Sequence, residues 1–151
     1  MQLSNKNALA ILLDLNQDIE EYAEATVKNI IEDKNFNLTY PPNNGLTELE
    51  KQELSKLDNN EHLKNALRKV IADNSAGIIF NMLNLFDGTG SPKHMYNHWT
   101  GVKLVDEDPN ENEEEFQDTL HDSFFETYWE WKKIRGNKNW KLDTFDGLPL
   151  D

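Results

Sequence analysis

Two of the four histidines, His94 and His98, stand four residues apart in the segment KHMYNHW. On a helix both imidazoles would share one face, and imidazoles at this spacing bind metal ions. A zinc protease motif also needs a glutamate directly after the first histidine, where this chain has Met95. The structural interpretation, which we prefer, is a pair of half-buried loop histidines beside Tyr96 and Trp99.

A carboxylate at Asp118 precedes His121 by three residues, the spacing of a carboxylate–histidine ligand pair. A di-iron bundle needs a Glu-x-x-His pair on each of two helices and a glutamate from each of two more. His62 has no glutamate three residues before it, so the set is incomplete. A metal-dependent hydrolase remains an alternative. Its candidate metal ligands would be His94, His98, Asp118, His121 and nearby carboxylates such as Asp122. We expect instead that the chain holds no metal and no cofactor.

No recognisable nucleophile for covalent catalysis is present. The chain has no cysteine, which excludes disulfides, thiolate chemistry and Cys-ligated metal centres. Ser75, Ser91 and Ser123 lack the Gly-x-Ser-x-Gly context of a nucleophile elbow. The stretch 87–91, DGTGS, is similar to a phosphate-binding loop, but it follows a predicted helix and lacks the final Gly-Lys-Ser/Thr. We interpret it as a helix stop and assign no catalytic residue.

Negative charge is the strongest chemical signal. The chain has 28 acidic and 15 basic residues, for a net charge of −13, and eleven acidic residues without a Lys or Arg fall between 106 and 130. Such a field repels nucleic acid and anionic lipid and speeds the encounter with a basic protein. The alternative is that the acidic run is an ordinary solvated helix face, which keeps the protein soluble. We take docking on a basic partner as the working hypothesis.

Aromatic residues crowd the same part of the chain. They are Phe124, Phe125, Tyr128, Trp129, Trp131, Trp140 and Phe145. Most of them are expected to pack in the core, while Phe125 and Trp129 remain available for a partner or for a second copy of the chain. The predicted partner-binding residues are Asp106, Glu107, Asp108, Glu111, Glu113, Glu114, Glu115, Asp118, Asp122, Phe125, Glu126 and Trp129.

The acidic and aromatic side chains are expected to lie on helices, because the sequence has a helical period. Apolar residues recur every three or four positions over 8–31, 46–57, 60–86 and 113–135. The expected N-caps of the first three helices are Ser4, Thr47 and Asn60, and Thr47 with Glu50 has capping-box spacing. An extended arm over 36–40, a turn over 42–45 and one short strand over 102–105 complete the pattern. The docking face is thus predicted to be an acidic helical surface over 106–130.

The fold predicted from these elements is mainly α. It is a single domain, 1–151, in which about four helices form a bundle around a central helix, 60–86, that becomes apolar most of the way round. Polar residues interrupt this central helix at Asn74, Ser75, Asn81 and Asn84. These polar residues indicate either a hydrogen-bond network between helices or a side of the helix that faces water. A functional alternative is that they line a small ligand pocket.

The sequence favours a cytoplasmic protein. The first fifteen residues contain a short apolar stretch that Asp14 interrupts, and no small-residue cleavage site follows. No run of about 18 uncharged apolar residues occurs, so no membrane span is expected.

In size, acidity and lack of cysteines and catalytic motifs, the chain is similar to small bacterial immunity and antitoxin proteins. The likeness lies in composition and rests on no specific residues. It implies a non-catalytic inhibitor that docks on a basic protein such as a toxin or nuclease, without contacting nucleic acid or membrane. Two alternatives stay open: the metal-dependent hydrolase, and a structural or regulatory subunit that self-associates as a homodimer through its aromatic helix.

Overall fold

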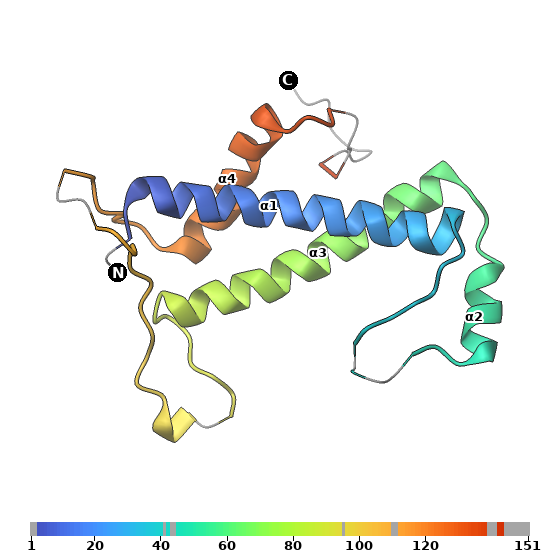
Figure 1. Cartoon of the computed structure of the whole chain (residues 1–151), viewed down its shortest axis with the longest axis horizontal. Coiled ribbons are helices and arrows are strands. Elements are labelled where there is room, and N and C mark those ends of the chain that lie inside the picture. Colours follow the sequence, from blue (N-terminus) through green and yellow to red (C-terminus); the bar gives the residue numbers. More distant parts are fainter. Residues whose placement is uncertain are drawn as a thin grey trace. The chain divides into compact units, whose positions relative to one another are not determined.

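A computed structural model describes residues 3–40, 42, 45–94, 96–109, 112–138 and 142–143. Within these residues the chain is mainly α, as predicted, with no strand (Figure 1). The α-helices are α1 (Asn5–Val27), α2 (Glu48–Ser55), α3 (Glu61–Phe86) and α4 (Leu120–Ile134). A π-helical segment, η1 (Lys28–Glu32), continues α1, and a 3₁₀ turn, η2 (Tyr96–His98), lies between α3 and α4. In the part of the chain so described, none of the helices combines the length and apolar character that a membrane span needs.

The chain divides into two compact units. The first unit contains Met1–Ile19 and Asn74–Lys138, and the second contains Glu20–Asp73 and Asn139–Asp151. Helices α1 and α3 each supply residues to both units.

The core of the first unit comes mainly from α1 and α4. Its buried apolar residues are Leu3, Ala8, Leu12, Ile19, Leu83, Leu120, Phe124 and Trp131. The side-chain amide of Asn16 on α1 donates to the Phe124 carbonyl of α4 at 3.5 Å. The predicted N-cap of α1 is confirmed, because the Ser4 hydroxyl accepts a hydrogen bond from the Asn7 backbone N–H at 3.3 Å.

Helix α3 is less central than its sequence indicated. Phe80 faces α4, where its ring lies 5.5 Å from the ring of His121. On the other side of the helix Ile78 is 72% exposed and Met82 is 40% exposed. The prediction of a helix buried most of the way round was therefore wrong for residues 74–86, because the described residues leave the side of α3 with Ile78 and Met82 exposed.

The glycine-containing stretch after α3 is a helix stop, as predicted. Gly88 has a φ of +74°, a left-handed conformation that costs a residue without a Cβ little. The backbone N–H groups of Thr89 and Gly90 both donate to the Asn84 carbonyl at 3.0 Å. Asn84 also accepts from the Thr89 hydroxyl at 2.8 Å, so one of the polar residues within α3 serves the cap. Asn74 and Asn81 are exposed, which fits the water-facing flank.

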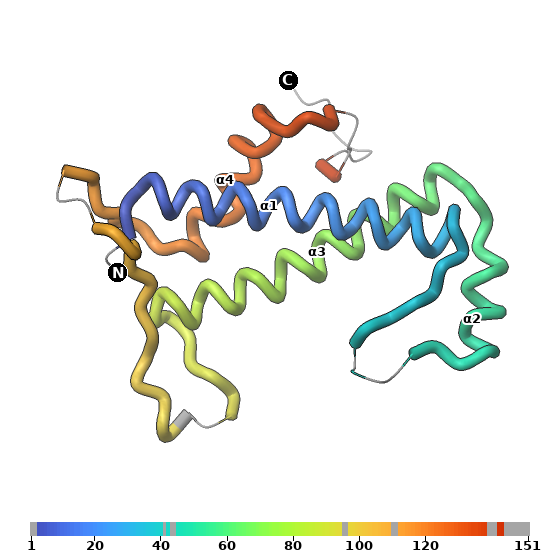
Figure 2. Tube along the Cα trace, in the orientation of Figure 1, coloured from blue at the N-terminus to red at the C-terminus, as the bar shows by residue number. Residues whose placement is uncertain are grey.

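Between α3 and α4, the described residues 87–94, 96–109 and 112–119 are irregular apart from the short turn η2 (Figure 2). The strand expected over 102–105 does not form, and the helix expected from Glu113 begins only at Leu120. Tertiary pairing explains the late start. Ser4 and Glu115 form an antiparallel bridge, the Asn5 N–H donates to the Glu114 carbonyl at 2.9 Å, and the Phe116 N–H donates to the Leu3 carbonyl at 2.8 Å.

The second unit has the capping residues that the sequence predicted. Thr47 and Glu50 form a reciprocal capping box at the start of α2, with the Thr47 backbone N–H donating to Glu50 Oε2 at 2.7 Å. This backbone hydrogen bond, followed by the one from the Thr47 hydroxyl, lowers the pKa of Glu50. Asn60 Oδ1 accepts from the backbone N–H groups of His62 and Leu63, at 2.8 and 3.2 Å, and so caps α3. The arm over 36–40 is irregular.

Ion pairs supplement a small core in the second unit. Its buried apolar residues are Ala23, Val27, Ile31 and Ala72. Lys64 is buried, pairs with Glu61 and lies 3.0 Å from Glu32. The Glu61 carboxylate and then the Glu32 carboxylate raise the pKa of Lys64. Arg68 pairs through two nitrogens with both carboxylate oxygens of Glu24.

Candidate functional site

The acidic run 106–130 does not form one helical surface, which corrects the prediction. Residues 106–109 and 112–119 are irregular, and only Asp122, Glu126 and Glu130 lie on α4. The exposed acidic residues of the irregular part are Glu107, Asp108, Glu113, Glu114, Glu115 and Asp118. Glu111 lies outside the described residues.

Two of these acidic residues hold the amino-terminal segment in place. Asp106 is half-buried, and its carboxylate accepts the Ser4 backbone N–H through both oxygens, at 3.3 and 3.2 Å. Hydrogen bonds from the side chains of Asn7 and then Ser4 keep the pKa of Asp106 below its ordinary value. Glu114 Oε2 accepts from the Asn5 side-chain amide at 3.3 Å. These contacts give Asp106 and Glu114 a structural role.

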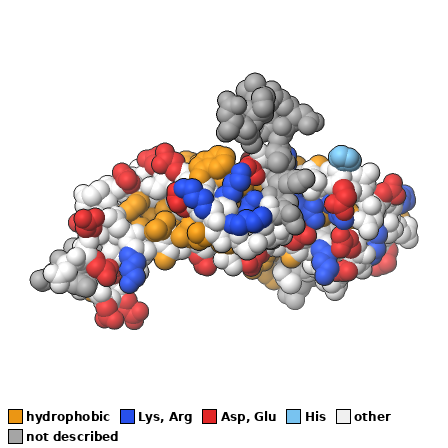
Figure 3. Space-filling view, turned by 90° about the horizontal axis from the view of Figure 1, so that it is seen from above, with side chains coloured by type: hydrophobic (Ala, Val, Ile, Leu, Met, Phe, Trp, Pro, Cys, Tyr) orange, Lys and Arg blue, Asp and Glu red, His pale blue; other side chains and the backbone are white. Residues whose placement is uncertain are grey.

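The exposed side of α4 joins acidic and aromatic side chains. Positions 122, 125, 126 and 129 follow the three- and four-residue steps of one helical face. Phe125 is 55% exposed and Trp129 is 52% exposed, while Asp122 and Glu126 beside them are also exposed. The face of the molecule drawn in Figure 3 has hydrophobic side chains open to solvent beside both basic and acidic ones. We call Asp122, Phe125, Glu126 and Trp129 the acidic–aromatic face.

The opposite side of α4 packs inward. Phe124 and Trp131 are buried, as the core interpretation of most aromatics predicted, together with Leu120 and Thr127. Trp140 and Phe145 of the predicted aromatic cluster lie outside the described residues.

Neighbouring rings support both exposed aromatics. The Phe125 ring centroid lies 5.5 Å from that of Phe80 and 5.2 Å from that of Phe124. Trp129 makes an edge-on contact with Tyr128 at 5.3 Å, and the Lys132 ammonium lies 5.3 Å from the Trp129 ring centroid. Because these contacts restrict the rings before any partner arrives, binding through them costs less conformational entropy.

The predicted metal ligands do not gather. His94 and His98 are exposed rather than half-buried, and Asp118 is exposed in the irregular segment before α4. Within the described ranges no three His, Asp or Glu side chains are placed to hold a metal ion. The i, i+3 relation of Asp118 to His121 is not helical, because α4 starts at Leu120.

His121 instead pairs with an acidic residue that the sequence analysis did not select. Asp87 Oδ2 lies 2.7 Å from His121 Nδ1 and accepts the His121 backbone N–H at 2.9 Å. His121 Nε2 lies 3.5 Å from Asp122 Oδ1. The partners Asp87 and His121 are 34 residues apart, so no local spacing pointed to this contact.

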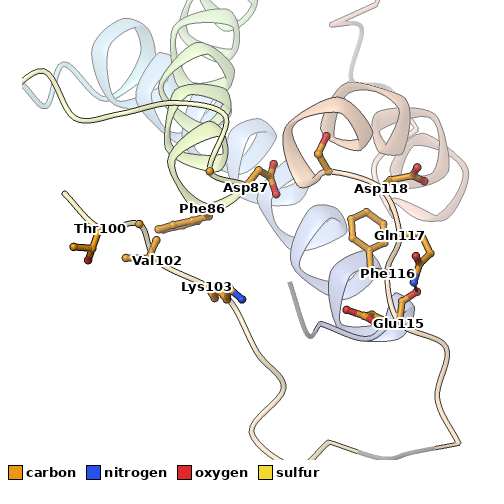
Figure 4. A pocket seen from close by; sticks show the side chains of 12 residues that line it. Phe86, Asp87, Thr100, Val102, Lys103, Glu115, Phe116, Gln117 and Asp118 are labelled. Atoms are coloured by element: carbon orange, nitrogen blue, oxygen red, sulfur yellow. Dashed lines mark hydrogen bonds between the residues drawn. The ribbon is translucent and has the colours of Figure 1, made fainter. Parts of the chain in front are cut away.

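A cleft of about 560 Å³ opens beside Asp87 in the first unit (Figure 4). Its walls come from the end of α3, from residues 100–103 and from residues 115–119. Phe86, Val102 and Phe116 supply apolar side chains, and Lys103 is its basic lining residue. None of the sequence predictions identified this cleft.

Comparisons of the chain with protein-family models, with curated proteins and with solved structures found no match. A functional proposal therefore depends on the residues and their geometry.

Proposed function

We propose that the chain is a non-catalytic binding protein that docks on a basic protein surface, as an inhibitor of the immunity or antitoxin kind would. The observation that carries the proposal is the acidic–aromatic face of α4. Phe125 and Trp129 are large apolar side chains that remain about half exposed in a chain of net charge −13. Their acidic neighbours Asp122 and Glu126 are on the same side of the helix.

The two kinds of side chain have different tasks in such a complex. Aromatic anchors supply most of the binding free energy when a partner covers them and removes water. Carboxylates around them raise the association rate with a positively charged partner and repel nucleic acid and anionic membranes. The exposed carboxylates of Glu107, Asp108, Glu113 and Asp118 extend the negative surface beyond α4.

A basic partner fits this surface better than a second copy of the chain. Self-association would bring together two chains that each carry a net charge of −13, and this repulsion opposes it. A basic toxin or nuclease carries the complementary charge. Covering its active site needs no chemistry from this chain.

The experiment starts from basic proteins encoded beside this gene. Each is co-expressed with the chain, and a retained partner is studied by stopped-flow association over a series of salt concentrations. The change Glu107→Gln, Asp108→Asn, Glu113→Gln removes three exposed carboxylates and should slow association about tenfold at low salt and flatten its salt dependence.

A matched control removes the same charge elsewhere. Asp33, Asp58 and Asp73 are exposed in the second unit, and their triple change to Asn lowers the negative charge equally. If the carboxylates before α4 attract the basic partner, this control should change the association rate much less. Equal association rates for the two triple variants, or binding that ignores Phe125→Ala and Trp129→Ala, would contradict the proposal.

A further inference from the structure

The cleft at the end of α3 has the size and lining of a small-molecule site. Its volume of about 560 Å³ lies within the range of roughly 300–1,000 Å³ that such sites occupy. Phe86, Val102 and Phe116 offer apolar surface, while Asp87 and Gln117 contribute polar groups. A few polar groups on apolar walls orient a ligand in a pocket.

The Asp87 carboxylate is the unusual group of this lining. Its side chain is 0% exposed, and its two oxygens have different surroundings. Oδ2 receives the His121 backbone N–H at 2.9 Å and lies 2.7 Å from His121 Nδ1. Oδ1 is also buried, yet no donor among the described residues reaches it. Since a buried charged oxygen without a donor is unfavourable, Oδ1 marks a place for a hydrogen-bond donor.

The charges around the cleft select a cation. Its lining contains the carboxylates of Asp87, Glu115 and Asp118 against the one ammonium of Lys103. An anionic ligand would meet repulsion from the Asp87 and Glu115 carboxylates, whereas Figure 4 draws the Asp118 side chain turned outward. A cationic donor would gain both a charge-assisted hydrogen bond at Oδ1 and a favourable local field.

We propose that this cleft binds a small organic cation, an ammonium group attached to an apolar ring. The ammonium donates to Asp87 Oδ1, and the ring packs against Phe86 and Phe116, which Figure 4 draws on either side of the Asp87 carboxylate. Because Oδ1 is buried, the proposal requires that the side chains covering this oxygen move when the ligand enters. The lining segment 115–119 is irregular rather than helical, so a movement of its side chains breaks no helical hydrogen bond. The proposal is independent of the docking function.

Phenethylamine is the probe, titrated into ¹⁵N-labelled protein and followed by two-dimensional NMR. Saturable shifts are expected at the amides of 87–88, 101–103 and 116–119. The neutral analogue 2-phenylethanol should bind at least about tenfold more weakly, because it cannot form the charged pair. Asp87→Asn should weaken phenethylamine binding by about the same factor, with far-UV circular dichroism to check its fold.

A second pair of variants tests whether the ligand binds in the cleft, without changing Asp87. Val102→Trp fills the cleft and should abolish the shifts, whereas Val105→Trp adds the same bulk at an exposed residue outside the lining and should leave them unchanged. N-acetyl-lysine methylamide tests the other source of an ammonium, a side chain of a bound protein. Tighter binding of this compound than of phenethylamine would overturn the assignment to a small aromatic cation.

Three further results would also overturn the proposal. They are the absence of saturable shifts at millimolar phenethylamine, equal affinity for 2-phenylethanol, and equal effects of the two tryptophan substitutions. Unchanged affinity in a folded Asp87→Asn variant would overturn it as well, because the proposed charged pair would then be absent.

Discussion

Asp87 and His121 join the end of α3 to the first turn of α4. Asp87 Oδ2 lies 2.7 Å from His121 Nδ1 and accepts the His121 backbone N–H at 2.9 Å. The N-cap residue of α4, Thr119, makes no side-chain capping bond, and its hydroxyl donates to Asp122 Oδ2 at 2.6 Å instead. The carboxylate of Asp87, the residue just after α3, therefore satisfies an N–H group that the local sequence leaves open, and its negative charge suits the N-terminus of α4.

Removal of this carboxylate should destabilise the first unit. Asp87→Ala leaves the buried His121 N–H without its acceptor, and we expect a loss of about 1–3 kcal/mol in the free energy of unfolding. Asp87→Asn keeps a carbonyl acceptor and should cost less. Urea unfolding of the two variants measures the difference, and equal stability of Asp87→Ala and the parent protein would refute this capping role.

Adjacent phenylalanines on α4 should respond very differently to truncation. Phe124 is 1% exposed, and Phe124→Ala should lower the free energy of unfolding by about 3–5 kcal/mol. Phe125 is 55% exposed and mainly touches other rings, so Phe125→Ala should cost about 1 kcal/mol. Thermal or urea unfolding checks both values, and similar losses would show that the two sides of α4 are wrongly assigned.

Acid should weaken the attachment of the amino-terminal segment to Asp106. Hydrogen bonds from Asn7 and Ser4 lower the pKa of Asp106 below its ordinary value of 3.8. A carboxyl group with a lowered folded-state pKa contributes stability above its unfolded-state pKa and loses it as pH falls through the folded-state pKa. The stability difference between the parent and Asp106→Asn should therefore be constant above about pH 5 and shrink below pH 4. Urea unfolding over this pH range is the measurement; a difference that grows in acid would have the wrong sign.

The capping box of α2 gives a test in the second unit. Thr47→Ala removes the hydroxyl that accepts from the Glu50 N–H and should destabilise α2 by about 1 kcal/mol. Amide hydrogen exchange at residues 50–55 reports this local loss. Thr39→Ala in the irregular arm is the matched control and should leave those rates unchanged. Identical exchange in both variants would count against the cap.

Sequence patterns located the helices where the local signal was strong. The apolar period and the caps at Ser4, Thr47 and Asn60 placed the first three helices within a few residues of their ends. The start of α4 was missed because residues 114–116 bond with Leu3 and Asn5, more than 100 residues away. That competition for backbone hydrogen bonds leaves no trace in local periodicity.

The candidate sites likewise include features that local sequence patterns predict and features that depend on residues far apart in the chain. Period alone identified Phe125 and Trp129 as residues beside, rather than within, the buried stripe of α4. The Asp87–His121 contact and the cleft bring together residues that are far apart in the chain, which no spacing rule describes. A local clue did exist, since Asp87 directly precedes the helix-ending Gly88 and so lies at the end of α3.

The π-helical turn at the end of α1 constrains the length of the chain there. The Asp33 N–H bonds to the Lys28 carbonyl at 3.0 Å, five residues back, so η1 contains one residue more than an α-helical turn. Each helical residue rotates its side chain by about 100°, and this extra residue brings Glu32 round to the buried ammonium of Lys64. Deletion of one residue from η1 would swing Glu32 away and leave Lys64 with Glu61 alone. Segment length, as much as residue type, thus determines which charges meet inside this unit.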